Sequence, residues 1–269
     1  MNLPEQHKTP HYQPLIHPIC ELAIAAGKRI MQFYHSKEHE TAIKADNSPV
    51  TDADIAAHQM IVGTLREWTP KLPVVSEENR EHPDVSASPL YWLVDPLDGT
   101  KSFIRRSDEF TVNIALMENH RPVFGVIYIP AQDTLYYGSE AFGAYRQMSG
   151  EMPCRIQARV QPEEGAAVVV SVSHITKEAE AFLETITLES KVAASSSLKF
   201  CRIAEGVADI YPRFGPTCEW DTAAGHAIVE AAGGRVLTVD GQEFTYGKPG
   251  FLNPGFIVWG KVADEVEDD

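Results

Sequence analysis

The sequence contains no apolar run that approaches the ~20 residues of a membrane-spanning helix. Its longest apolar stretch, residues 166–172, has the length of a buried strand. The first 14 residues are polar, include prolines and lack the apolar centre of a signal peptide. These absences predict a cytoplasmic protein.

Closely spaced cysteines are also missing. The four cysteines, Cys20, Cys154, Cys201 and Cys218, form no Cys-x-x-Cys pair. This spacing excludes the common zinc-binding and thioredoxin-like motifs. We expect reduced thiols that behave as small apolar residues in a reducing compartment.

Basic residues are scarce relative to acidic ones. The 269 residues include 23 Lys and Arg against 38 Asp and Glu, which gives a formal net charge of −15. Proteins that bind long nucleic acids use basic surfaces to displace counterions, so a nucleic-acid polymer is not the expected partner. A small phosphorylated ligand is compatible with this charge if a cation offsets the carboxylates beside it, and a divalent metal ion is the natural choice.

The chain shows no internal repeat and no low-complexity tract, and its 43% apolar content is ordinary for a globular protein. Apolar residues recur at three- and four-residue steps from 16 to 34, which predicts a helix. A second helix is expected from 52 to 68, because the residue before Pro70 avoids helical angles. Short apolar runs between 73 and 146 predict an antiparallel meander.

The later part of the chain changes character to strands that alternate with helices, the helices being expected at 176–188, 198–205 and 221–232. This pattern favours layered α+β and α/β lobes over a (β/α)₈ barrel. The expected parts are a loose N-terminal arm at 1–14, an α+β lobe with the metal-binding loop at 15–150, an α/β lobe at 151–263 and an acidic tail at 264–269.

The most informative segment is DPLDGT at residues 95–100, which follows an apolar strand. Asp95 and Asp98 lie three residues apart on a tight loop and can point at one place. Such close carboxylates stay ionised when a cation neutralises them, and oxygen ligands suit Mg²⁺. An ordinary turn is the alternative, because Asp, Pro and Gly are the usual turn formers.

Three further acids strengthen the metal interpretation because they too stand at element ends. Glu77 follows a strand, Asp54 lies near a helix start and Asp221 begins an apolar helix. Taken singly, Asp221 can be a helix N-cap and Asp54 a favourable charge on the helix dipole. Haloacid dehalogenase phosphatases need Asp-x-Asp, and the two-residue spacing here excludes their aspartyl-phosphate chemistry.

These residues resemble the inositol monophosphatase superfamily. Its two signatures are an acidic DP[LI]DG[TS] loop and a WDxA[AG]G helix start, which here read DPLDGT at 95–100 and WDTAAG at 220–225. The resemblance extends from about Cys20 to Trp259. The segments SSSLKFC at 195–201 and YPRFGP at 211–216 are similar to the branch of bacterial CysQ-type 3'(2'),5'-bisphosphate nucleotidases.

The resemblance implies an αβαβα five-layer sandwich of the inositol monophosphatase/fructose-1,6-bisphosphatase type, with the site between the lobes. It also implies two to three Mg²⁺ ions and inhibition by lithium. The implied metal ligands are Glu77, Asp95, Asp98, Asp221 and the Leu97 carbonyl. In the implied catalytic set, Asp54 and Thr100 orient the attacking water and Glu77 supports it.

The implied reaction removes the 3'-phosphate of adenosine 3',5'-bisphosphate in the nucleotide recycling of sulfur assimilation, and the sulfated form of this nucleotide is a second candidate substrate. The residues implied to contact the substrate are Gly99, Thr100, His174, Ser196, Ser197, Lys199, Arg213 and Asp221. Ser102 and Asn79 depart from the acids common in close relatives, which puts the approach to the site in doubt.

Two alternatives for the function stay open. The same chemistry can act on an inositol or sugar phosphate, and a chain of another class would be a non-catalytic metal or nucleotide sensor. Some relatives are described at the cytoplasmic face of the inner membrane. The oligomeric state is undetermined, with a monomer favoured.

Overall fold

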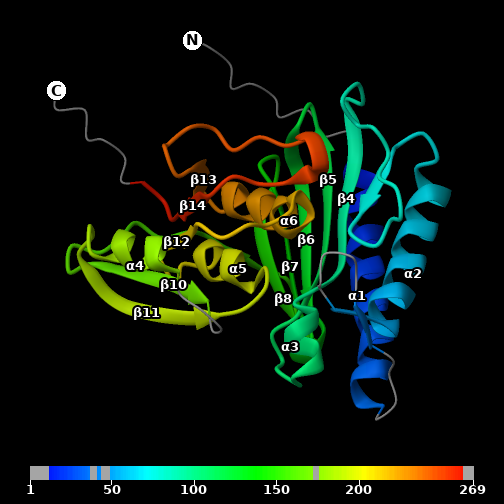
Figure 1. The fold of residues 1–269 in the computed structure, drawn as a ribbon, viewed down its shortest axis with the longest axis horizontal. Helices are drawn as coiled ribbons and strands as arrows, with labels where there is room; N and C mark the ends of the chain where they lie inside the picture. Colours follow the sequence, from blue (N-terminus) through cyan, green and yellow to red (C-terminus); the bar gives the residue numbers. More distant parts are fainter. Residues whose placement is uncertain (1–11, 37–40, 44–48, 172–175, 263–269) are drawn as a thin grey trace.

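Two β-sheets face each other across a pair of helices in this computed structural model, which describes residues 12–36, 41–43, 49–171 and 176–262 (Figure 1). The arm residues 1–11, the tail residues 263–269 and the substrate candidate His174 lie outside the described residues. At the end of the expected arm, Tyr12 is buried, and its hydroxyl donates to the Val123 carbonyl at 3.1 Å.

The helices of the described chain are α1 Ile16–His35, α2 Asp52–Trp68, α3 Thr100–Ile104, α4 Lys177–Leu183, α5 Leu198–Ala204 and α6 Glu219–Ala231. The earlier strands of the described chain are β1 Thr41–Ile43, β2 Pro49–Thr51, β3 Val74–Ser76, β4 Leu90–Asp98, β5 Thr111–Glu118, β6 Arg121–Ile129, β7 Thr134–Ser139, β8 Gly143–Met148 and β9 Cys154–Ile156. The later strands are β10 Ala166–Ser171, β11 Leu188–Ala194, β12 Ile210–Arg213, β13 Arg235–Thr238 and β14 Phe256–Trp259.

The larger sheet has the order β3-β4-β5-β6-β7-β8-β9, so its strands follow the chain. Only the β3–β4 pair is parallel, and β4 to β9 form the expected antiparallel meander. The smaller sheet has the order β11-β10-β12-β14-β13 and mixes parallel with antiparallel pairs.

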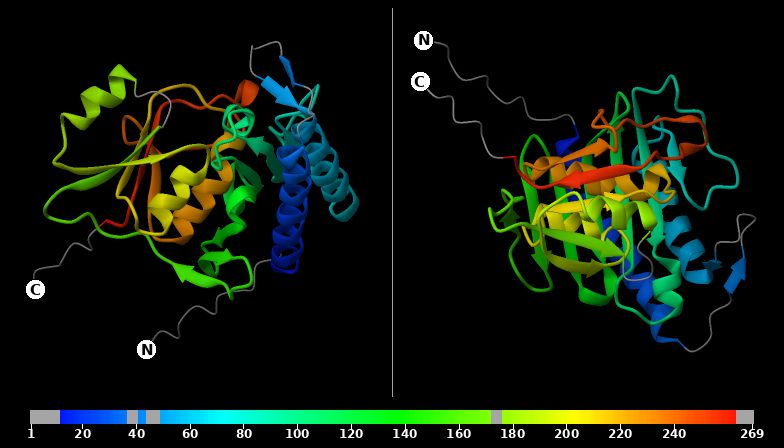
Figure 2. Two further views of the ribbon diagram at one scale, coloured as in Figure 1. Left: turned by 90° about the horizontal axis from the view of Figure 1, so that it is seen from below. Right: turned by 60° about the vertical axis from the view of Figure 1, so that its left-hand side comes forward.

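Three apolar clusters bind these elements into layers. The first lies between α1, α2 and one face of the larger sheet, and the second between the two sheets around α5 and α6. The third lies between the smaller sheet and α4, where Leu183 contacts Val168 and Ile257. Side chains of alternate strand residues point to opposite faces, so Val168 faces α4 while Val169 faces the central layer. The order is therefore helix, sheet, helix, sheet, helix, which confirms the five-layer sandwich (Figure 2).

Helix α6 comes late in the chain but lies directly on the larger sheet. Gly125 of β6 permits this approach, because a Cβ atom there would collide with the carbonyl of Ala224 in α6. Gly138 of β7 lies in the same way against Ala231. The helix that carries Asp221 is thus seated on the sheet that carries Asp95 and Asp98.

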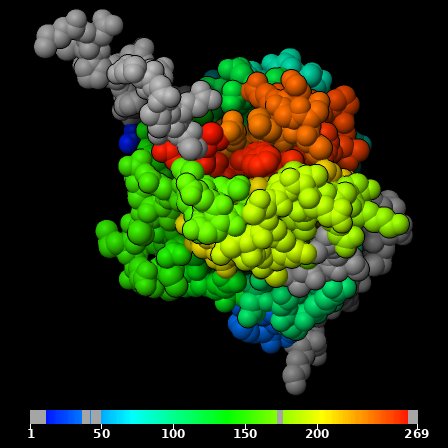
Figure 3. Space-filling view, turned by 90° about the vertical axis from the view of Figure 1, so that its left-hand side faces the viewer, coloured from blue at the N-terminus to red at the C-terminus, as the bar shows by residue number. Residues whose placement is uncertain are grey.

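One expectation about the elements was wrong, and one strand was not expected. The helix expected at 176–188 is the shorter α4, and residues from Leu188 onward form β11, which pairs in parallel with β10. This strand is polar and mostly exposed, so it lacks the apolar alternation by which a strand is recognised. Figure 3 faces this lobe and shows the yellow-green segment with α4 and β11 across its surface.

The four cysteines are free, two of them buried. Among the described residues, no helix combines the length and the apolar composition that crossing a membrane requires.

Candidate active site

A bulge in β4 presents the two acids of the DPLDGT segment. Asp95 pairs with Asn113 of β5 and Asp98 pairs with Thr111, so the register shifts between the two acids. We expected a loop after residue 94, but the strand continues to Asp98 because β5 supplies partners on both sides of the bulge. The backbone amide of Leu97 donates to Asp95 Oδ1 at 3.1 Å and closes the bulge locally.

The first turn of α2 places Asp54 beside this bulge. Thr51 and Asp54 form a capping box, in which the Thr51 amide and hydroxyl donate to Asp54 Oδ2 at 2.8 and 2.6 Å. The other carboxylate oxygen, Oδ1, accepts from the Thr100 hydroxyl at 3.0 Å. Burial raises the pKa of Asp54, and repulsion by Glu77 adds to the rise, while the hydrogen bonds from the two threonines oppose it. Asp54 therefore does place a favourable negative charge in the first turn of α2, as the alternative proposed. That role does not explain its hydrogen bond with Thr100.

The start of α6 brings Asp221 to the same place from the other half of the chain. Its Oδ2 accepts from the Cys218 amide at 2.8 Å, and the two residues form a capping box. Cys218 is therefore the N-cap of α6, and the alternative that made Asp221 the N-cap is wrong, because Asp221 is the third residue of the helix. Ser197 Oγ lies 2.9 Å from Asp98 Oδ2 and 2.9 Å from the Asp221 carbonyl oxygen. A single hydroxyl therefore spans the acids of β4 and α6.

The carboxyl groups raise one another's pKa. The pKa of Asp95 is raised first by burial, then by repulsion from Glu77, Asp98 and Asp221, and by a hydrogen-bond contact with Glu77. Burial followed by repulsion from Asp98 raises the pKa of Asp221 to about 8. Burial also raises the pKa of Asp98, which the nearby Lys199 ammonium opposes. A set of buried like charges of this kind calls for a cation.

The donor set fits a hard divalent cation by its chemistry. It consists of carboxylate oxygens and the carbonyl of Leu97, the ligand types that Mg²⁺ prefers. As the described side chains stand, no three His, Cys, Asp or Glu residues converge closely enough to hold an ion.

A cleft of about 700 Å³ opens beside the acids. Lys199 and Arg213 line it together with Asp98 and Asp221, so it carries both signs of charge. Burial lowers the pKa of Lys199 to about 8, against the attraction of Asp98. Its Nζ lies 5.5 Å from the centre of the Tyr211 ring. Phosphate oxygens are the natural partners of two such cations.

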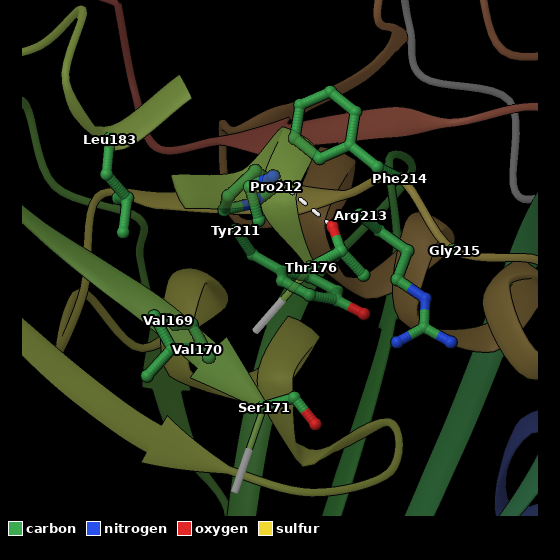
Figure 4. A pocket seen from close by; sticks show the side chains of 11 residues that line it. Val169, Val170, Ser171, Thr176, Leu183, Tyr211, Pro212, Arg213, Phe214 and Gly215 are labelled. Atoms are coloured by element: carbon green, nitrogen blue, oxygen red, sulfur yellow. Dashed lines mark hydrogen bonds between the residues drawn. The ribbon is translucent and has the colours of Figure 1, made fainter. Parts of the chain in front are cut away.

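A second, smaller pocket adjoins this cleft and shares Ser171, Tyr211 and Arg213 with it. Figure 4 shows Val169, Val170 and Leu183 on one side of this pocket and the Phe214 ring on another, with the Arg213 guanidinium extending away from the ring. The two spaces together offer a charged region and an apolar region side by side.

Most of the expected site residues are brought together. Gly99 has a φ of 91° at the start of α3 and lines the cleft with Ser196. Ser196 Oγ lies 3.1 Å from the Asp98 carbonyl and 3.0 Å from the Glu109 carbonyl, so its hydroxyl has acceptors within the protein. Ser197 is 1% exposed and does not line the cleft, so its hydroxyl meets protein groups in place of the expected substrate.

The sequence interpretation missed Asn113 and Tyr211. Asn113 is 1% exposed, and its Nδ2 donates to Ser197 Oγ at 2.8 Å. The available signal was a polar amide in the middle of the apolar segment TVNIAL at 111–116. Tyr211 was noted only as part of a motif, although its ring forms a wall of both pockets.

A fold of this kind is also found in known proteins. A model of the inositol monophosphatase family matches residues 11–265. The chain therefore belongs to the inositol monophosphatase family. Its structure is similar to that of an inositol monophosphatase from Zymomonas mobilis, with a TM-score of 0.76 and 26% identity over 94% of this chain and 95% of that one.

Higher similarity is found with proteins of one branch. The 3'(2'),5'-bisphosphate nucleotidase CysQ of Salmonella typhimurium strain LT2 is 48% identical over 247 residues, which are 91% of this chain and 99% of that protein. The protein of the same name from Escherichia coli K12 is 46% identical over the same shares. The crystal structure of CysQ from Bacteroides thetaiotaomicron has a TM-score of 0.82 and 40% identity, covering 94% of this chain and 99% of that one.

Proposed function

We propose that this chain is a metal-dependent 3'(2'),5'-bisphosphate nucleotidase that hydrolyses the 3'-phosphate of adenosine 3',5'-bisphosphate. The single observation that carries the proposal is the cluster of mutually repelling carboxylates, Asp95, Asp98 and Asp221, at a cleft lined also by Lys199 and Arg213. The identity of 46–48% to CysQ nucleotidases supports the choice of substrate.

The family is metal-dependent, generally on Mg²⁺. The proposed site would hold two to three Mg²⁺ ions. Their ligands would be Glu77, Asp95, Asp98, Asp221 and the Leu97 carbonyl. The bound ions supply positive charge that acidifies a neighbouring water and neutralises the phosphoryl oxygens. Binding also removes the repulsion that raises the pKa of Asp95 and Asp221.

The chain's own residues handle the proton. The Thr100 hydroxyl donates to Asp54 Oδ1, so its oxygen lone pairs are free to accept a hydrogen from the attacking water. Attack forms a bond from the water oxygen to phosphorus and breaks the bond from phosphorus to the ribose 3'-oxygen. The water proton passes through Thr100 to Asp54, whose pKa burial has already raised. The leaving oxygen takes a proton from solvent and becomes the 3'-hydroxyl.

The two adjoining spaces suit a nucleoside bisphosphate. The charged cleft accepts phosphate groups at Lys199 and Arg213, and the apolar pocket beside Phe214 accepts the flat face of a base. The Gly99 and Thr100 amides open α3 next to Asp98, where they can face the phosphate that is cleaved. An inositol phosphate would leave the apolar pocket unfilled.

The test is phosphate release from adenosine 3',5'-bisphosphate, inositol 1-phosphate and fructose 1,6-bisphosphate, each with Mg²⁺, with EDTA and with added lithium. We expect Mg²⁺-dependent, lithium-sensitive release chiefly from the nucleotide. Release chiefly from an inositol or sugar phosphate would keep the metal chemistry and overturn the substrate. No release from any of them would favour a metal or nucleotide sensor.

A further inference from the structure

The hydroxyl of Ser197 occupies an unusual position between the two halves of the acidic cluster. Its oxygen lies 2.9 Å from Asp98 Oδ2, 2.9 Å from the Asp221 carbonyl oxygen and 2.8 Å from Asn113 Nδ2. Ser197 is 1% exposed, so bulk water does not compete for these contacts.

The three contacts cannot all be equivalent, because a serine hydroxyl has one hydrogen to donate. Asn113 Nδ2 is a donor and takes one lone pair of the Ser197 oxygen. The hydrogen of Ser197 is then shared between Asp98 Oδ2 and the Asp221 carbonyl. An ionised carboxylate is the stronger acceptor, so the hydroxyl points to Asp98.

The orientation of the Asn113 amide agrees with this arrangement. Its nitrogen lies 3.5 Å from Asp98 Oδ2 as well as 2.8 Å from Ser197 Oγ, so it faces two oxygens. The reverse orientation would place an amide oxygen against the carboxylate. Thr111 Oγ1 is also 3.5 Å from Asp98 Oδ2, which leaves Ser197 as the closest of the three side-chain donors.

The backbone around Ser197 is fixed to the same aspartate. The preceding Ser196 has a φ of 53°, and its hydroxyl lies within hydrogen-bond distance of the Asp98 carbonyl. Two consecutive serines at the start of α5 thus hydrogen-bond to Asp98, Ser196 to its backbone carbonyl and Ser197 to its carboxylate. The first turn of α6 is held to the same point through the Asp221 carbonyl.

We propose that Ser197 is a positioning residue, which fixes the direction of the Asp98 carboxylate and its distance from Asp221, and that it makes no contact with the substrate. This inference rests on the proposed function, because it assigns the two aspartates to a shared metal site. Groups that orient metal ligands in this way typically change metal affinity or activity by 10–100-fold when they are removed.

The test compares Ser197→Ala with Ser139→Ala, a matched control. Ser139 is also 1% exposed and hydrogen-bonded, to the Tyr12 hydroxyl at 2.6 Å, but it lies at the end of β7, outside the cleft. The first readout is the Mg²⁺ concentration that gives half of the full rise in melting temperature, measured without substrate. The second is kcat and KM for adenosine 3',5'-bisphosphate at saturating Mg²⁺.

For Ser197→Ala we expect a rise of about tenfold or more in the half-saturating Mg²⁺ concentration, a fall in kcat and a KM within about twofold of the parent. Ser139→Ala keeps the parent's Mg²⁺ dependence even where its melting temperature falls. An unchanged Mg²⁺ response in Ser197→Ala overturns the inference. A raised KM with unchanged kcat also overturns it, because Ser197 would then contact the substrate.

Asn113→Ala keeps the test decisive if Ser197→Ala does not fold. It leaves the hydroxyl in place but removes the donor that fixes its direction, so we expect a smaller loss of Mg²⁺ affinity in the same sense. An unchanged affinity in Asn113→Ala overturns the inference. A parent protein that neither responds to Mg²⁺ nor releases phosphate overturns the proposed function itself. A responsive parent whose variants keep its Mg²⁺ dependence overturns the inference alone.

Discussion

Asp221→Asn should stabilise the metal-free protein while it removes activity. The amide keeps an oxygen that can accept from the Cys218 amide, the 2.8 Å bond that caps α6, so the local structure is retained. What is lost is an acid whose ionisation is opposed by burial and then by repulsion from Asp98 and Glu77, which raise its pKa to about 8.

The sign and size of the effect follow from this pKa. Between pH 3.8 and pH 8 the folded protein keeps the Asp221 proton, which the unfolded chain has released, so stability falls as pH rises. Each pH unit in this range lowers the free energy of unfolding by about 1.4 kcal/mol, so the ionisable Asp221 destabilises the parent by on the order of 4 kcal/mol at pH 7. At roughly 2–4 °C per kcal/mol, the asparagine variant should melt on the order of 10 °C higher in EDTA at pH 7.

The assay is thermal melting in EDTA at several pH values from 5 to 9, with phosphate release in Mg²⁺ measured in parallel. The difference in melting temperature between the asparagine variant and its parent should widen from pH 5 to about pH 8 and then stay constant. In Mg²⁺, the variant should release phosphate roughly 10²-fold or more slowly than the parent. The exposed Asp240→Asn serves as the control and should show no gap. A gap that does not widen with pH, or a variant that melts below its parent at pH 8, would refute the reasoning.

Three other outcomes follow from the same contacts. Asp98→Ala should abolish turnover without unfolding the chain, and a variant with a native circular dichroism spectrum and a near-normal rate would rule out the metal model. Lys199→Met should raise KM for the bisphosphate about tenfold or more with a smaller change in kcat, because a cation that lines the cleft is lost. Steady-state kinetics that show a large fall in kcat with little change in KM would instead assign the lysine to the chemical step. Arg159→Ala should lower stability by about 3 kcal/mol, since it leaves Asp209, 2% exposed, without the partner that lies 2.8 Å away. Urea unfolding measures that loss, and kcat of the folded variant at 25 °C should match the parent.

The sequence was sufficient for elements whose signals are local. The α2 helix runs from Asp52 to Trp68 as expected, because Thr51 caps its start and Thr69-Pro70 ends it. The pairing of two acidic signatures likewise led to the correct family, because the chemistry depends on residue types that the sequence displays directly.

Features that depend on distant partners were missed or misplaced. The β4 bulge exists because β5 supplies Asn113 and Thr111, and nothing within residues 95–98 indicates those partners. The position of Ser197 depends on Asp98, 99 residues away in the chain, so a hydroxyl expected at the substrate lies instead inside the protein.

The seating of α6 on the larger sheet has a consequence for how such a protein can diverge. Ala224 and Ala231 of α6 lie against Gly125 and Gly138 of the larger sheet, so the helix that carries Asp221 is positioned on the same sheet as β4. The apolar pocket, by contrast, is built from β10, β12 and α4, which contact α6 little. Mutations in those outer elements can alter which molecule is recognised while the acidic cluster stays intact. The residues proposed for the reaction and the residues that line the apolar pocket thus lie largely on different elements of the chain.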